Sequence, residues 1–278
     1  MKTSKILVLS VFFLFCCLTM AFASETNSVV TEKERGLIDW SQNYIEATGM
    51  AVAPKGTTGP QGRALARRGA IVDLQRNLLE FLGGVRIDAR TVMEDFMAED
   101  RVRSEVNGMI KNVELTKGEW NPDEGFYVVT GRIKLQEVRT IVAPSLPVNV
   151  EIRAIVEEEK KTPPPPAAAK YTGLIIDVRH LNLVPSMTFR VFDENNRAIY
   201  GIEFVDHNAF LQSGLCSYYN NINYAKGDIH FAPNPISARA IRLGANNVDI
   251  IISNSEASRV RGSSYNFRKD GKVAIVSK

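Results

Sequence analysis

Three histidines and one late cysteine are the residues best suited to metal or nucleophilic chemistry, and their spacing predicts neither. His180, His207 and His230 lack the H-E-x-x-H spacing of a metalloprotease. Cys216 has no thiol-enzyme signature around it, so we expect a small, partly buried side chain. No G-x-S-x-G elbow marks a serine hydrolase. The sequence therefore predicts no catalytic residues, no metal ligands, no cofactor and no enzyme.

A glycine-rich loop followed by arginines raises the possibility of a phosphate site, because such loops often present a helix N-terminus to an anion. The residues concerned are Gly56, Gly59, Gly62, Arg63, Arg67 and Arg68. Neither G-x-x-x-x-G-K-[ST] nor G-x-G-x-x-G is present. We therefore expect a flexible loop and a solvated basic first turn, with a weak anion site at Arg63 and Arg67 left open as an alternative.

Two other groups of polar residues have simple structural interpretations. The pairs Glu94–Asp95 and Glu99–Asp100 fall in a charged helical stretch and predict a solvated face. Tyr218, Tyr219 and Tyr224 flank an Asn-Asn pair, which predicts an irregular surface loop with exposed rings. On this basis, replacing Tyr218 and Tyr219 by serine should preserve the fold and weaken attachment to a partner.

The elements before residue 156 alternate between strands and helices, which predicts a small α+β domain. The long helix should bury Ile71, Leu74, Leu78 and Leu82 and expose Asp73, Arg76, Asn77 and Glu80. Residues 121–124 are a hairpin turn signal. In order, we predict a strand over Tyr44–Val52, a helix over Gln61–Leu82, a strand over Val85–Val92, a helical stretch over Met93–Val106, and a hairpin of Lys111–Trp120 with Gly125–Leu135.

Four successive prolines, Pro163 to Pro166, divide the chain, since they donate no backbone hydrogen bonds and fix an extended conformation. We predict a semi-rigid linker over residues 157–170 between two separable domains. The second domain should also be α+β. Its predicted elements are strands over Leu174–Val178, Met187–Phe192, Ala198–Phe204, Asn247–Ser253 and Lys272–Val276, and a short helix over Ser255–Val260.

The first twenty-three residues resemble a secretory signal peptide. Lys2 and Lys5 precede an apolar run, and Ala21-Phe22-Ala23 is a small-x-small cleavage site. An uncleaved anchor and a lipid anchor at Cys16 or Cys17 are alternatives. Neither cysteine follows a small residue, so we expect soluble export with cleavage after Ala23.

Composition limits the classes of function. Loss of the signal removes two of three cysteines, so an internal disulfide is excluded. The formal charge of +3 falls to +1 without Lys2 and Lys5, which argues against nucleic-acid binding. At 45% apolar and 23% charged residues, the chain has an ordinary globular composition.

Several short motifs between Trp40 and Leu135 resemble the domain shared by LPP-type outer-membrane lipoproteins and the N-terminal part of the flagellar H-ring protein. They are Ala47-Thr48-Gly49-Met50-Ala51, Ala64-x-Ala66-Arg67-x-x-Ala70, Asp73-x-x-x-Asn77-Leu78, Val85-Arg86-Ile87-Asp88, Val106-x-Gly108 and Gly125-x-Tyr127-x-Val129. Residues 171–177 and 249–254 resemble a C-terminal extension found in exported bacterial proteins. The resemblance implies an envelope or assembly role and no catalytic residues.

Together these observations predict a signal peptide over 1–23, an α+β domain over 24–156, a linker over 157–170 and an α+β domain over 171–278. We expect a non-enzymatic periplasmic or outer-membrane-associated protein that binds an envelope protein partner, with assembly of a surface or flagellar structure as one role. It should be soluble rather than membrane-spanning. A periplasmic module for a small ligand or an anion is the alternative, with the ligand unknown.

Overall fold

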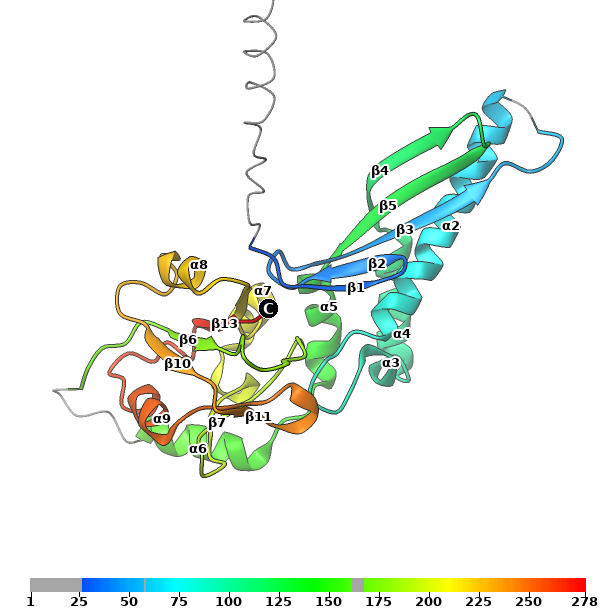
Figure 1. Ribbon diagram of the computed structural model, residues 1–278. Coiled ribbons are helices and arrows are strands. Elements are labelled where there is room, and N and C mark those ends of the chain that lie inside the picture. The colour runs from blue at the N-terminus through cyan, green and yellow to red at the C-terminus, as the bar shows by residue number, and fades with distance from the viewer. Residues whose placement is uncertain (1–26, 58, 162–167) are drawn as a thin grey trace, which may run out of the picture.

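The chain is an α+β protein of two domains, as its sequence predicts. The computed structural model describes residues 27–57, 59–161 and 168–278. The first domain carries an elongated sheet backed by a long helix, and the second is more rounded (Figure 1). The predicted signal peptide, with its cleavage site after Ala23, lies outside the described residues, and so do Pro163 to Pro166.

The sheet of the first domain has the order β1-β2-β3-β5-β4, and all neighbouring strands are antiparallel. All nine residues of β3 pair with β5, and β4 and β5 form the predicted hairpin. Side chains alternate along β3, so that Ile45 and Ala47 are buried while Met50 is exposed. The strands are β1 Val30–Lys33, β2 Gly36–Asp39, β3 Tyr44–Val52, β4 Glu114–Asn121 and β5 Phe126–Lys134.

One long helix, α2, covers one face of this sheet (Figure 1). Leu74, Leu78 and Leu82 are fully buried, which confirms three positions of the predicted apolar stripe, while the fourth, Ile71, is half-buried. The predicted exposure of Asn77 is wrong. Its side chain donates a hydrogen bond to the Thr48 carbonyl of β3, and only 8% of the residue is exposed. The helices are α2 Gly59–Gly83, α3 Met93–Phe96, α4 Asp100–Lys111, α5 Leu135–Val142, the 3₁₀ turn η1 Ala143–Ser145, and α6 Val150–Lys161.

Gly49 allows α2 to cross β3 at very short range. A Cβ atom at this position would lie 2.1 Å from the Leu74 nitrogen and 2.3 Å from the Ala70 carbonyl oxygen. Next to it, the edge of β3 that β2 leaves uncovered is satisfied by helix side chains. The Met50 N–H donates to Asp73 Oδ2 at 2.9 Å, and Asn77 Nδ2 donates to the Thr48 carbonyl at 2.8 Å. These contacts give the Thr-Gly-Met and Asp-x-x-x-Asn motifs a structural role.

The segment after α2 differs from its prediction. Residues 85–92 do not form a regular strand, and only a single bridge joins Arg86 to Val92. Here Asp88 Oδ1 accepts hydrogen bonds from the Arg90 and Thr91 N–H groups, so a side-chain turn replaces the strand. The predicted helical stretch from Met93 is likewise two helices, α3 and α4, rather than one.

The second domain contains two four-stranded sheets. In the first, with order β10-β6-β13-β9, every neighbouring pair is parallel; in the second, with order β11-β12-β7-β8, only β12 and β7 are parallel. The strands are β6 Leu174–Asp177, β7 Val191–Phe192, β8 Ala198–Tyr200, β9 Ser217–Tyr219, β10 Ile236–Arg239, β11 Arg242–Leu243, β12 Ile250–Ile251 and β13 Val273–Val276. The helices are η2 Ile202–Phe204, α7 His207–Ser213, α8 Ile222–Gly227, η3 Ala245–Asn247 and α9 Asn254–Arg261.

The predicted strands at both ends of this domain, β6 and β13, are confirmed, and so is helix α9. The three predicted strands between them are too long. Only Val191–Phe192, Ala198–Tyr200 and Ile250–Ile251 pair as strands, while Ile202–Phe204 forms a 3₁₀ turn. Apolar runs here are buried in irregular backbone, which a strand pattern does not distinguish from a regular strand.

The two domains pack directly against each other rather than being held apart by a spacer. The rings of Trp40 and Tyr218 lie 5.8 Å apart across the junction, and the Thr188 N–H and hydroxyl both donate to the Ile87 carbonyl. Their buried residues form one continuous hydrophobic cluster. The domains are therefore coupled mechanically.

Helix α6 precedes the prolines in sequence but packs on the second domain (Figure 1). Glu159 in α6 forms an ion pair with Arg268 at 2.7 Å. Residues 157–161, predicted as the start of the linker, are therefore the end of a helix. The charged residues of this run therefore belong to the last turns of α6 and do not mark the start of the linker.

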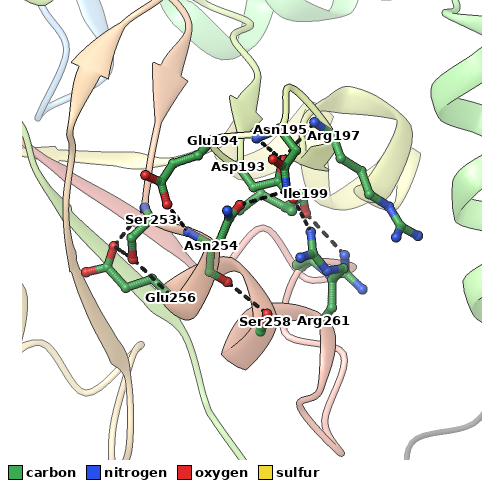
Figure 2. A network of polar contacts seen from close by, with 11 residues as sticks. Asp193, Glu194, Asn195, Arg197, Ile199, Ser253, Asn254, Glu256, Ser258 and Arg261 are labelled. Atoms are coloured by element: carbon green, nitrogen blue, oxygen red, sulfur yellow. Dashed lines mark hydrogen bonds and ion pairs between the residues drawn. The ribbon is translucent and has the colours of Figure 1, made fainter.

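Asp193 organises the turn between β7 and β8 and ties it to α9 (Figure 2). Its Oδ1 accepts hydrogen bonds from the Asn195 and Arg197 N–H groups, and its Oδ2 pairs with Arg261 Nη1 at 2.9 Å. Burial raises the pKa of the Asp193 carboxyl, but the hydrogen bonds from Arg197 and Arg261 outweigh it and hold the pKa below its usual value.

We expect Asp193→Asn to lower the free energy of unfolding by about 3 kcal/mol at neutral pH, because Arg261 loses a buried partner. The folded-state pKa of Asp193 lies below the usual value of about 3.9, so the ionised carboxyl stabilises the fold. This stabilisation is present at pH values above about 3.9 and is lost as the pH falls below that point. Urea unfolding of the wild type and of Asp193→Asn should therefore give a difference in free energy of unfolding that decreases below about pH 4. A difference that stays constant down to acid pH would contradict the assignment of this stabilisation to the ionised Asp193 carboxyl.

Candidate functional site

The sheet of the first domain has one face without a covering element among the described residues. We call α2, β3, β4 and β5 the arm; in it α2 packs on one side of the sheet only (Figure 1). On the other side, Met50 and Val52 of β3 stand opposite Val128 and Phe126 of β5. Met50 is 53% exposed and Val52 is 65% exposed. These four residues, the apolar block, form a contiguous apolar surface where an exposed sheet face is normally polar.

A groove runs beside the apolar block, between the end of the β1–β2 hairpin and β3. Its volume is about 710 Å³. Leu37, Met50 and Val128 supply apolar lining, while Glu34 and Arg35 of the hairpin turn supply charges. The Thr48 N–H donates to the Arg35 carbonyl and holds the hairpin against β3. The groove and the block together offer an apolar surface with a charged rim.

The end of the sheet nearer the second domain is polar. Arg132 pairs with Glu46 on the neighbouring strand and stacks 4.2 Å from the centre of the Tyr44 ring. The hydrogen bond that Arg132 donates to Glu46 raises the pKa of Arg132, and burial raises the pKa of Tyr44. Both groups therefore keep their ordinary charge states at neutral pH, and this end of the face resembles a solvated sheet surface.

The outer edge strand β4 is protected against pairing with another strand. Its register shifts between Leu115 and Lys117, which is a β-bulge. Lys117 and Glu119 place an ion pair at 3.0 Å on the exposed strand. Bulges and charges are the usual protection of an open edge. The exposed face, rather than the edge, is thus the surface of the arm available for a partner.

The described residues of the glycine-rich loop, with residue 58 left out, do not form a phosphate cradle. Gly56 and Gly59 adopt positive φ angles, and Arg63 and Arg67 are exposed on the first turns of α2. Arg67 borders only a shallow hollow with Lys117 of β4. The described part of the loop therefore places its arginines toward solvent, as expected for a basic first turn.

The three histidines lie apart. His180 contacts the Ala240 carbonyl at 3.0 Å, His230 packs edge-on against Phe231, and His207 begins α7. Within residues 27–57, 59–161 and 168–278, no three His, Cys, Asp or Glu residues are grouped to hold a metal ion. The four predicted solvated carboxylates, Glu94, Asp95, Glu99 and Asp100, are all exposed. Asp95 Oδ2 also accepts the Val92 N–H at the start of α3.

Cys216 is partly buried, as predicted, and burial raises the pKa of its thiol, which makes it a poor nucleophile at neutral pH. The prediction that Tyr218 and Tyr219 are exposed is wrong. They form strand β9, and only 5% and 7% of these residues are exposed. The Tyr218 hydroxyl bonds with Ser186, and the Tyr219 hydroxyl donates to Asp228 at 2.6 Å. Serine at both positions would leave cavities in the core and destabilise the fold, so the double substitution would not preserve it.

No helix over the described part of the chain is both long and apolar enough to cross a membrane.

Comparison with known protein families finds a match in the second domain. No curated protein matches the chain. Residues 173–278 match the family model described as the second domain of Tp0624 of Treponema pallidum. This match begins just before β6 and ends after β13, so the second domain is similar to that domain of Tp0624.

Proposed function

We propose that this chain is a non-enzymatic protein of the bacterial cell envelope, periplasmic or outer-membrane-associated, that binds another protein in the assembly of a surface or flagellar structure. The observation that carries the proposal is the apolar block on the uncovered face of the arm. Four apolar side chains at neighbouring sheet positions have no intramolecular partner element among the described residues. Burying them against a partner gains about 25 cal/mol per Å².

The partner is expected to present an apolar segment bordered by charges. The groove beside the block has a volume of about 710 Å³, and its hairpin rim carries Glu34 and Arg35. The buried residues of both domains form one hydrophobic cluster, so a partner bound to the arm would be attached to the second domain through a continuous core. A rigid two-domain body with an exposed apolar arm suits an assembly role.

A photo-crosslinking amino acid at position 52 should give one saturable adduct with an envelope protein in intact cells. The matched control is position 72, since Val72 of α2 is 57% exposed and Val52 is 65% exposed. The double variant Met50→Thr, Val52→Thr should weaken binding to the partner so identified by about tenfold or more, with unchanged circular dichroism. Equal adducts at positions 52 and 72, or undiminished binding of the double variant, would show that the arm is not the binding surface.

A further inference from the structure

At the domain junction lies a second concave site, formed by segments from both domains. The turn between β2 and β3, the end of α4, strands β4 and β5, and helices α5 and α7 border a cleft of about 590 Å³. This volume is within the range of small-molecule sites, about 300–1,000 Å³. Five primary amides border it, together with one buried arginine, Arg139. The amides belong to Gln42, Asn43, Asn112, Gln136 and Gln212, and we call this site the amide cleft.

Arg139 is a buried cation without a carboxylate partner among the described residues. Only 4% of it is exposed. Its Nε and Nη2 donate to the carbonyls of Leu211 and Gln212 at the end of α7, and its Nη1 donates to Asn43 Oδ1. A guanidinium has five N–H donors. Three are used, so two N–H groups remain without an acceptor in the described protein.

The charge of Arg139 persists at neutral pH. Burial lowers the pKa of its guanidinium to about 10, which still leaves it protonated at pH 7. A buried positive charge with spare donors favours an anion, and a carboxylate is the group that accepts two parallel N–H bonds. The rim carries two cations, Arg132 and Lys134, and two carboxylates, Glu114 and Glu137, and Arg132 is already paired with Glu46. The anion preference therefore comes from the buried arginine rather than from a basic surface.

The amides indicate what surrounds that carboxylate. Gln42 makes no side-chain hydrogen bond within the described residues, and Asn112 and Gln136 each use only their NH₂ group. Asn43 and Gln212 use only their carbonyl oxygen. The cleft thus offers both donors and acceptors. Hydroxyl groups are the ligand chemistry that both donates and accepts, so several hydroxyls on one small ligand match this lining.

We propose that the amide cleft binds a sugar acid: a small, hydroxyl-rich molecule whose carboxylate lies against Arg139. This site lies at the opposite end of the sheet from the apolar block and shares none of its four residues. It also differs from the anion site considered at Arg63 and Arg67. Those arginines are exposed, whereas Arg139 is buried and borders a cleft lined by residues of both domains.

The test is an NMR titration of the ¹⁵N-labelled chain without its first twenty-three residues, using D-glucuronate as probe. We expect saturable shifts of the Arg139 Nε–H and of the Gln42 and Gln212 side-chain amides. D-glucose lacks the carboxylate and acetate lacks the hydroxyls, so each should bind at least tenfold more weakly. Absence of shifts at these groups would overturn the proposal, as would equal binding of acetate, which would indicate a plain anion site.

Variants outside the core keep this test independent of folding. Gln42→Ala and Gln212→Ala alter exposed side chains and should each weaken glucuronate binding by about tenfold. Gln61→Ala, which removes an exposed amide of α2 outside the cleft, is the matched control and should leave binding unchanged. Equal binding by all three variants would also overturn the proposal.

Discussion

Replacing Gly49 by alanine should lower the free energy of unfolding by about 3 kcal/mol or more. The added Cβ would lie 2.1 Å from the Leu74 nitrogen and 2.3 Å from the Ala70 carbonyl, and both are backbone atoms of α2. Neither atom moves without shifting the helix. A shift would separate α2 from β3 and lengthen the hydrogen bonds that Asp73 and Asn77 make to the strand edge.

Chemical denaturation followed by circular dichroism measures the effect. The matched control is Gly108→Ala in α4, where a Cβ would have no neighbour within 4 Å. This control should raise the free energy of unfolding by about 0.5–1 kcal/mol, since alanine is the better helix former. If Gly49→Ala unfolded at the wild-type denaturant concentration, the close crossing of α2 over β3 would be disproved.

Replacing Arg139 by methionine should lower the free energy of unfolding by about 2–3 kcal/mol. Methionine keeps much of the apolar length but leaves the carbonyls of Leu211 and Gln212, at the end of α7, without their donors. The loss of the buried charge offsets part of this cost, which is why the expected value is below the sum of three hydrogen bonds. Asn43, held at a φ of 59°, also loses its partner.

The pH dependence separates this cause from a general packing defect. The folded-state pKa of Arg139, about 10, lies below its unfolded value, so the unfolded chain binds more protons only above about pH 10. The contribution of Arg139 to the free energy of unfolding therefore changes only in that alkaline range, where it rises with pH. The difference between wild type and Arg139→Met should stay constant from pH 6 to pH 9. A difference that varied across this range would implicate another titrating group.

Local signals in the sequence were sufficient for several elements. The turn residues 121–124 predict the β4–β5 hairpin, and the apolar stripe through Leu74, Leu78 and Leu82 predicts the buried face of α2. In the second domain, the short apolar runs that became β6 and β13 were found because they are buried on both faces. Each of these signals lies within one segment and repeats with the period of its secondary structure.

Other features depend on contacts between distant residues and were mispredicted. Tyr218 and Tyr219 have polar neighbours in sequence, yet Trp40, Ser186 and Asp228 surround them in space. Their burial is decided by a parallel strand pairing with β13 that no local pattern encodes.

The sequence by itself determined the fold class, the long amphipathic helix, the main hairpin and the shortage of nucleophiles and metal ligands, because these follow from residue type and short-range period. Tertiary structure alone decided which face of the arm is uncovered, and where the chain passes to its second domain. It also brought Gln42, Arg139 and Gln212 together. Their side chains converge only after the β2–β3 turn, α5 and α7 have packed, so their separation along the chain carries no signal of the cleft they form.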